Sequence, residues 1–505
     1  MKKSFILGGI LLLGGCISDL DLEKFNDPKF NYDAHWIIPV AKATLTLEDV
    51  VRESKYVQID PDNALRVVYR QDSLFTVNAT DFSEIPNQDS LSFDVAVGLG
   101  KQTFSGSLGT LAGGQLTRIL MGEGFLFWET DPVGGTGTIT VELDNVTQMG
   151  GPVSFQINAS PSGESGSIDI SGMEFDLSQG SNPYNNLGFT MEIINSSLTP
   201  GSNIPVTFRY TDITVEEVDG YIGQRNISIP TQTIDLDLGG IEEFFDGLYL
   251  TDPKITLETV TNVGIPFNLT PYINGVNKNG QIKTLNAPSF NVAGAQFKGD
   301  WDTSKYVLNA QNSNVTDFIS FIPHQIIAGG NVQTNPAGPA QNFITGNGAA
   351  VLNMEMDLPL TLRAENMRFE KDINDIDWGI DPDRSESIDL LTLHMKFKNS
   401  LPLQASVRLL MIQNGVAVDS VVVTDLLQAA QVDGQGRVQV PVDYRTSITL
   451  DQPQIDNLLR SKTVRFKAVF NTTNNGQTPV TFYSDYFLEV GVGLEAKLNV
   501  NVEDL

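Results

Sequence analysis

The sequence predicts a mainly β protein, with several antiparallel β-sandwich or open-barrel domains in tandem and few short helices. The first observation is an alternation of apolar with polar or small residues, seen at 93–99, 139–143, 234–238 and 391–397. A period of two is typical of half-buried antiparallel strands. The second is the recurrence of Asn-Gly and Asp-Gly pairs between such runs, which suit tight hairpins because both residues tolerate positive φ. The third is how seldom a helical period occurs.

The amino terminus has the layout of an export signal. A short basic start, Met1-Lys2-Lys3, precedes an apolar run from Phe5 to Leu13. At about 1.5 Å per residue such a run is too short to cross a hydrocarbon core of about 30 Å. We therefore expect residues 1–15 to be a signal peptide rather than a membrane span.

The end of that run resembles the lipobox of bacterial lipoproteins. It reads Leu13-Gly14-Gly15-Cys16: a branched apolar residue, two small residues and a cysteine. The resemblance implies cleavage before Cys16, acylation of its thiol with chains such as palmitate, and a lipidated tether over 16–35. It also implies an outer-membrane protein, anchored by lipid and exposed on the cell surface. The alternative is an ordinary secretory peptide with a chance cysteine.

Three acids in the tether bear on which membrane face is reached. Asp19, Asp21 and Glu23 resemble the acidic tags that direct some bacterial lipoproteins to the outer face of the outer membrane. The alternative is that they only keep a tether solvated.

We expect three further regions along the chain. They are an N-terminal β region at 36–240, made of one domain or two, a middle β domain at 241–385, and a C-terminal β domain at 386–505. The last should contain a short helix, because Asp451 can cap it, Pro453 suits its first turn, and Ile455 and Leu459 share one face. Shorter helices are expected at 47–52 and 241–245.

Composition limits the partners and the chemistry. The formal net charge is −29 over 505 residues, which opposes binding to nucleic acid. Cys16 is the single cysteine, so its lipidation leaves no thiol for a disulfide or for catalysis. The three histidines, at 35, 324 and 394, are too scattered for a zinc motif.

A calcium loop is the best candidate metal site. Acids recur at alternate or near-alternate positions in one stretch, which comprises Asp375, Asp377, Asp381, Asp383 and Glu386. The spacing resembles an EF-hand loop, although Gly379 replaces an acid and Ile380 replaces the loop glycine. The alternative is a solvated acidic linker between domains.

Two local patterns concern binding. Trp128 ends the most conspicuous aromatic run, Phe125-Leu126-Phe127-Trp128, and could stack on a ligand such as a sugar, or lie in the core. Separately, Asp252-Pro253 with the apolar residues that follow to Phe267 loosely resembles β-sandwich domains of the late-embryogenesis-abundant type. That resemblance implies a β-sandwich and no activity.

No motif commits the chain to a reaction. It lacks a G-x-S-x-G elbow, an H-E-x-x-H pair, a P-loop and a dinucleotide fingerprint. We therefore expect a non-catalytic lipoprotein that acts as a binding or structural subunit of a cell-envelope assembly, held on the membrane by its lipid and contacting an envelope protein or a glycan. The alternatives are a surface glycan-binding lipoprotein and a carrier of lipid or other apolar cargo.

Overall fold

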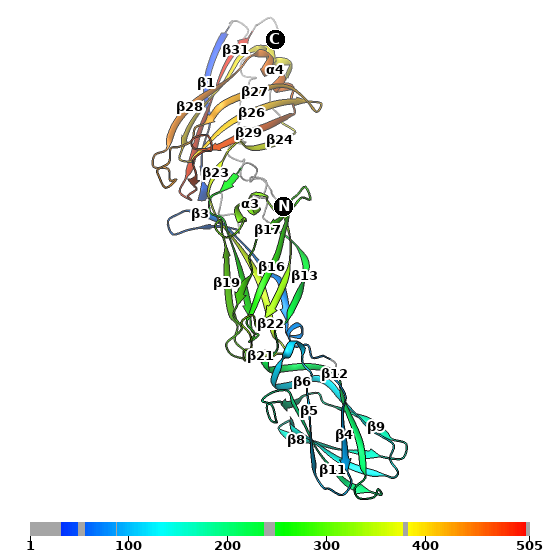
Figure 1. Ribbon diagram of the computed structural model, residues 1–505. Helices are drawn as coiled ribbons and strands as arrows, with labels where there is room; N and C mark the ends of the chain where they lie inside the picture. Colours follow the sequence, from blue (N-terminus) through cyan, green and yellow to red (C-terminus); the bar gives the residue numbers. More distant parts are fainter. Residues whose placement is uncertain (1–31, 49–55, 87, 237–247, 377–381, 501–505) are drawn as a thin grey trace.

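The computed structural model describes residues 32–48, 56–86, 88–236, 248–376 and 382–500. Strands dominate these ranges, and all of the paired strands are antiparallel. They build three bodies that follow one another along a long, bent axis (Figure 1). We name them the upper, middle and lower body after their places in that figure. The predicted mainly β class with few short helices is confirmed.

The upper body consists of two four-stranded sheets. The first has the order β1 (Tyr32–Thr46), β31 (Phe487–Val500), β25 (Ile388–Asn399) and β28 (Val442–Leu450). The second has the order β24 (Met367–Ile373), β29 (Thr463–Thr472), β26 (Leu403–Gln413) and β27 (Val416–Leu427). Buried Phe397, Ala405 and Leu427 pack between the two sheets, which therefore enclose a shared core.

Helix α4 (Gln452–Arg460) packs on one end of the upper body beside the short helix η5 (Pro382–Ser387). The Asp451 side chain accepts a hydrogen bond from the Gln454 N–H, and the Asp451 N–H donates one to the Gln454 side-chain oxygen. Ile455 and Leu459, one turn apart, bury the apolar face against Leu450 and Val421. The predicted helix after Asp451 is thereby confirmed.

The middle body is a pair of five-stranded sheets. One contains β19 (Asp302–Leu308), β15 (Lys254–Thr261), β22 (Ala349–Pro359), β3 (Leu65–Asn78) and β2 (Val57–Ile59). The other contains β13 (Asn226–Asp235), β20 (Gln325–Thr334), β16 (Phe267–Val276), β17 (Ile282–Leu285) and β18 (Phe290–Val292). The helices α2 (Ala79–Phe82) and α3 (Val315–Ser320) lie beside these sheets. The segment that suggested a β-sandwich thus supplies β15 and the start of β16, in different sheets.

The lower body is built on a ten-stranded sheet that curls until it is nearly closed. Its main path is β21 (Asn342–Thr345), β12 (Asn203–Tyr221), β6 (Gln115–Thr130), β10 (Met173–Asp176), β7 (Gly137–Gln148), β11 (Asn186–Ser196) and β5 (Gln102–Ser107). Three strands pair off this path: β4 (Leu91–Ala96), β8 (Gly151–Ala159) and β9 (Glu164–Asp169). The turn η3 (Leu111–Gly113) precedes β6. The ring centroid of Phe93 on β4 lies 5.1 Å from that of Phe104 on β5 and 5.4 Å from that of Phe189 on β11. The curled sheet therefore closes around aromatic side chains.

Strand pairing does not follow chain order. β1 pairs with β31 along almost its whole length, and the chain leaves the middle body after β3 and returns to it at β13. The sequence led us to expect three domains made of consecutive ranges, but the bodies mix these ranges. For example, β24 lies inside the expected middle range 241–385 and pairs with β29 in the upper body. A small sheet of β14 (Leu248–Leu250), β23 (Thr361–Ala364) and β30 (Val480–Thr481) links the upper and middle bodies. In the described ranges, no helix is both long and apolar enough to span a bilayer.

Candidate functional site

The predicted anchor, Cys16, lies outside the described residues, as do Asp19, Asp21 and Glu23. The structure shows where the first described residues of the chain lie. Tyr32 pairs with Val500, so β1 begins beside the last residues of β31. That end of the upper body lies opposite the lower body in Figure 1. The first described residue therefore lies at the end of the molecule farthest from the lower body.

The predicted calcium loop is described only in part. Asp377 and Asp381 lie outside the described residues, and the side chain of Glu386 is not described either. Asp375 is exposed, and Asp383 forms a 3.3 Å ion pair with Arg460 at the end of α4. The part of the chain that the structure describes contains no group of three or more acidic, histidine or cysteine side chains able to hold a metal. Calcium binding by this loop stays a prediction.

Trp128 lies on β6 and packs partly buried against the core of the lower body. Its register partner on β9 is Gly166, and a methyl group built on Gly166 would lie only 2.7 Å from the indole Cζ2. One face of the ring is therefore covered by Gly166, in the manner by which an aromatic shields a glycine in a strand. Trp301 is exposed, but it belongs to the middle body, so these two indoles do not form a shared platform.

A cluster of buried, hydrogen-bonded polar side chains lies at the joint between the lower and middle bodies. Asn335 and Asn342 are each 1% exposed, and each donates from its side-chain amide to the side-chain oxygen of the other. Asn335 also donates to the carbonyl of Gly223, and Asn342 to that of Gly264. The Ile222 N–H donates to the Asn342 side chain. The chain that returns from the lower body is thus fixed to the loop between β20 and β21.

A charge cluster adds to the same joint. Arg118 on β6 hydrogen bonds to Glu174, to Glu217 at 2.8 Å and to Asp219 at 3.1 Å. Lys298, on a loop of the middle body, binds Glu217 at 3.0 Å and Asp219 at 2.9 Å. The hydrogen bond from Arg118, assisted by Lys298, lowers the pKa of the Glu217 carboxyl below its ordinary value. Glu217 and Asp219 therefore bridge cations from two bodies.

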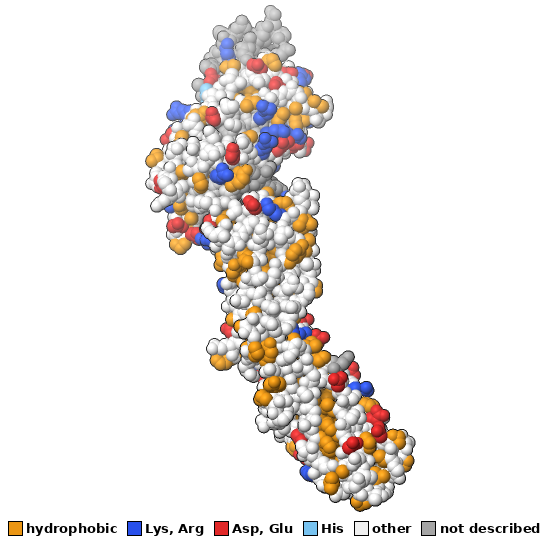
Figure 2. Space-filling view, viewed as in Figure 1, with side chains coloured by type: hydrophobic (Ala, Val, Ile, Leu, Met, Phe, Trp, Pro, Cys, Tyr) orange, Lys and Arg blue, Asp and Glu red, His pale blue; other side chains and the backbone are white. Residues whose placement is uncertain are grey.

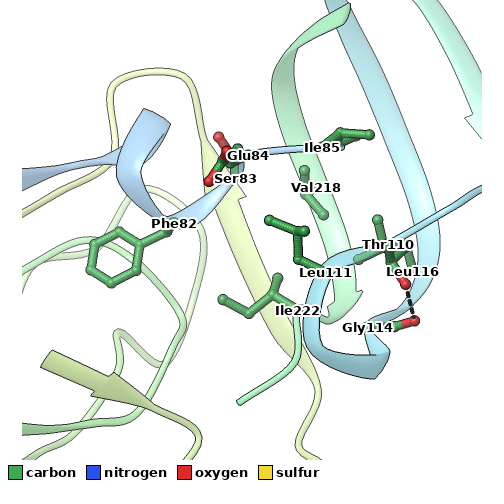
Figure 3. A pocket seen from close by; sticks show the side chains of 10 residues that line it. All are labelled: Phe82, Ser83, Glu84, Ile85, Thr110, Leu111, Gly114, Leu116, Val218 and Ile222. Carbon is green, nitrogen blue, oxygen red and sulfur yellow. Dashed lines mark hydrogen bonds between the residues drawn. The ribbon is translucent and has the colours of Figure 1, made fainter. Parts of the chain in front are cut away.

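A small cavity lies inside this joint (Figure 3). Its lining includes Phe82 and Ile85 from the segment after β3, Leu111 from the turn η3, and Val218 and Ile222 from the end of β12. Its volume of about 20 Å³ is room for one water rather than for an organic ligand. Beside it, Arg225 donates to the Phe82 carbonyl at 3.1 Å and pairs with Glu84 at 2.7 Å.

The joint between the upper and middle bodies is bonded through backbone and one arginine. Leu65 N–H donates to the Phe482 carbonyl, and Ser484 N–H to that of Asn63. Arg437 lies 4.1 Å from the ring centroid of Tyr483 and pairs with Asp485 at 2.9 Å. The two backbone bonds join segments more than 400 residues apart in sequence, so sequence reasoning had no local signal for them.

A chain of hydrogen bonds on the upper body joins three groups that catalysis often combines. His394 on β25 bonds through Nδ1 to the Ser447 hydroxyl at 2.8 Å and through Nε2 to the Glu495 carboxylate at 2.6 Å. The three strands are adjacent, and Ser447 lies on the exposed outer face of the sheet. This arrangement orients the imidazole.

Comparisons with known proteins establish no family. No protein-family model matches the sequence, and no curated protein matches it. Among solved structures, the chain is similar to a candidate secreted protein of Parabacteroides distasonis, at 9% identity over 64% of this chain and 99% of that one, with a TM-score of 0.22. It is also similar to a structure of infectious bursal disease virus, strain Gt, at 10% identity over 88% and 82% of the two chains, with a TM-score of 0.14. Overlaps this poor carry no argument about function.

Proposed function

We propose that the chain is a non-catalytic, lipid-anchored scaffold of the bacterial cell envelope, which carries its lower body away from the membrane and acts by binding. The observation that carries this proposal is the placement of the two ends. β1, which follows the tether directly, begins at one end of the molecule, and the lower body occupies the other (Figure 1). A protein with this plan separates its anchor from its most distant surface.

The joints support a scaffold because they oppose bending. The buried amide pair of Asn335 and Asn342 is hydrogen bonded to backbone on both sides of one joint, and backbone bonds cross the other. Breaking a buried, satisfied network leaves polar groups without partners, which costs about 1–3 kcal/mol for each group. The bodies should therefore keep their relative positions rather than swing freely.

The anchor is supported by the order of segments at the amino terminus. A basic start, an apolar run and Leu13-Gly14-Gly15-Cys16 occur in the arrangement that lipoprotein signals share. Several acyl chains on one residue hold a soluble domain firmly on a bilayer, at about 0.8 kcal/mol per buried methylene. We place the protein on the outer membrane, with its bulk on the cell surface.

The anchoring step is tested by replacing the lipidated residue. Cys16→Ser should release the protein into a soluble exported fraction or leave its signal peptide uncleaved, as read by membrane fractionation and by mass spectrometry of the amino terminus. Ser18→Ala, two residues further on, is the matched control and should stay on the membrane. If the Cys16→Ser protein had lost its signal peptide and still fractionated with membranes as fully as the parent, lipid anchoring would be rejected.

A further inference from the structure

The outer face of the β1-β31-β25-β28 sheet carries a row of cations. Lys42 on β1 pairs in register with Gly491 on β31, Gly491 with Lys396 on β25, and Lys396 with Arg445 on β28. Residues in register across a sheet point to the same face. Lys396 is two residues from His394, whose bonds to Ser447 and Glu495 lie on the outer face, so the row lies there too. All three cationic side chains are exposed.

The three cations of this row share the lack of an acidic partner. Among the described residues, no ion pair or hydrogen bond engages the side chains of Lys42, Lys396 or Arg445, although the chain has 61 acidic residues against 32 basic ones. Figure 2 shows Lys and Arg gathered mainly on the upper body in that view. A chain with so many acids could have neutralised these positions. Three cations left unpaired in one row therefore indicate a complementary anionic partner.

Glycine leaves the middle of the row open. A methyl group built on Gly491 would meet only the Lys396 carbonyl oxygen, at 3.9 Å. Gly493, two residues further along β31, is the register partner of His394 and likewise carries no side chain. A ligand can thus approach the backbone of β31, with Lys42 on one side and Lys396 and Arg445 on the other.

The neighbouring rows restrict the shape of that ligand. On one side of the cations lies a row of two acids and one cation, Glu489, Lys398 and Asp443, which keeps a net negative charge, and beyond His394 on the other side lies Glu495. A broad anionic surface, such as a bilayer, would press its charges against these acids as well as against the cations. A single line of anionic groups laid along the row would meet only the cations.

We infer that this face is a docking site for an extended acidic polypeptide segment with acids at alternate positions. At about 4.8 Å per strand, the row from Lys42 to Arg445 spans about 14 Å. Carboxylates at positions i, i+2 and i+4 of an extended segment span about 13 Å, at about 3.3 Å per residue. The overall lengths match. The cations lie about 9.6 and 4.8 Å apart, so each carboxylate meets one cation when the flexible Lys396 side chain leans towards Gly491. This inference deepens the proposed binding role by naming a partner chemistry, and it does not depend on the lipid anchor.

The test measures binding to the purified full-length Cys16→Ser chain, at low salt, of a fluorescent seven-residue peptide in which Thr and Asp alternate and three positions are Asp. A second peptide carries three consecutive Asp residues among Thr, so its charge is the same. The alternating peptide should bind more tightly, and raising the salt from 20 to 500 mM should weaken its binding at least tenfold, because exposed charges are screened over about 3 Å near 1 M salt and about 30 Å at 0.01 M. Equal affinity for both peptides, or no binding of either, would overturn the inference.

Two variants separate the site from general attraction. Lys42→Gln with Lys396→Gln and Arg445→Gln should abolish binding, whereas the charge-matched set Arg368→Gln, Lys371→Gln and Arg408→Gln, on the other sheet of the upper body, should not. Gly491→Val keeps every charge, suits a strand, and fills the floor, so it should also abolish binding. Binding that survives Gly491→Val, or that both triple variants weaken equally, would contradict the site.

Inorganic phosphate and vesicles of phosphatidylglycerol in phosphatidylcholine should not compete with the peptide, and competition by either would reassign the row to phosphate-bearing ligands. Failure of these tests would leave the anchoring experiment unaffected.

Discussion

The side-chain amides of Asn335 and Asn342 donate to each other's oxygens at 2.9 and 3.0 Å, in a site from which water is almost wholly excluded. Asn335 follows β20 and Asn342 begins β21, so the pair closes the loop between these strands. β21 pairs with the end of β12. A reciprocal amide pair satisfies one donor and one acceptor of each residue at a time. The Asn335 amide also donates to the Gly223 carbonyl, and the Asn342 amide to the Gly264 carbonyl. The Asn342 side-chain oxygen also accepts from the Ile222 N–H, which makes this pair the centre of the joint.

Removing one amide should therefore weaken the joint. Asn342→Ala leaves the Asn335 side chain, the Ile222 N–H and the Gly264 carbonyl short of partners, and should lower the free energy of unfolding by about 3 kcal/mol. Chemical denaturation followed by fluorescence measures the loss, and limited proteolysis should cut the variant near residues 222–225 first. Asn279→Ala, in an exposed turn, is the control and should change little. A joint variant as stable as this control would show that the network contributes nothing.

The charge cluster predicts a pH-dependent stability. Because Arg118 and then Lys298 lower the pKa of Glu217 from its ordinary 4.5, folding favours the ionised carboxyl. That stabilisation is complete above pH 4.5 and is lost as the pH falls through the lowered pKa of the folded state. Glu217→Gln should thus cost about 1 kcal/mol at pH 7 and progressively less in acid. Thermal unfolding from pH 3 to 7 tests this, with exposed Glu129→Gln as control; a cost that grew as the pH fell would contradict the assigned cause.

Trp128 should matter to stability through its packing on Gly166. Trp128→Ala should lower the free energy of unfolding by about 3 kcal/mol, and Gly166→Ala should also destabilise, because its methyl group would collide with the ring. Phe125→Ala removes an exposed ring from the same strand and should be mild. If soluble glycans raised the melting temperature of the parent but not that of Trp128→Ala, ligand stacking by Trp128 would be supported instead.

Calcium binding by the acidic loop remains to be measured. If Asp375, Asp377, Asp381, Asp383 and Glu386 hold the ion, chelation should lower the melting temperature and added Ca²⁺ should restore it, since a ligand of the folded state stabilises that state. Asp377→Ala should remove the response. If a chelator did not change the melting temperature of the parent protein, the segment would be an acidic linker and not a calcium site.

Local features of the fold could be read from the sequence, because local patterns determine them. Asp451 and Pro453 marked the start of α4, and the alternation at 391–397 marked β25, which lies antiparallel to the terminal strand β31. The packing of that strand was less predictable. Leu494 is only half-buried, and α4 contacts β25, β26 and β27 more than β31. A period of two identifies a face, but it does not identify what covers that face.

The joints and the cation row could not be read in the same way. The amide pair depends on Ile222 and Gly264 as well as on residues 335 and 342, and the row brings together positions 42, 396, 445 and 491. Each of these residues is unremarkable among its sequence neighbours. Only strand pairing over hundreds of residues, which loop closure and core packing decide together, places them side by side.

The central claim, that the molecule is anchored at one end and presents the lower body at the other, can be measured as a height above the membrane. With Cys16 lipidated, a cysteine introduced at Leu99, in the exposed hairpin between β4 and β5, or at Lys462, beside α4, is the single free thiol for a fluorophore. In lipidated protein reconstituted into vesicles that contain a headgroup-attached quencher, the label at position 462 should be quenched and the label at position 99 should not. Equal quenching at both positions, or stronger quenching at position 99, would contradict the account.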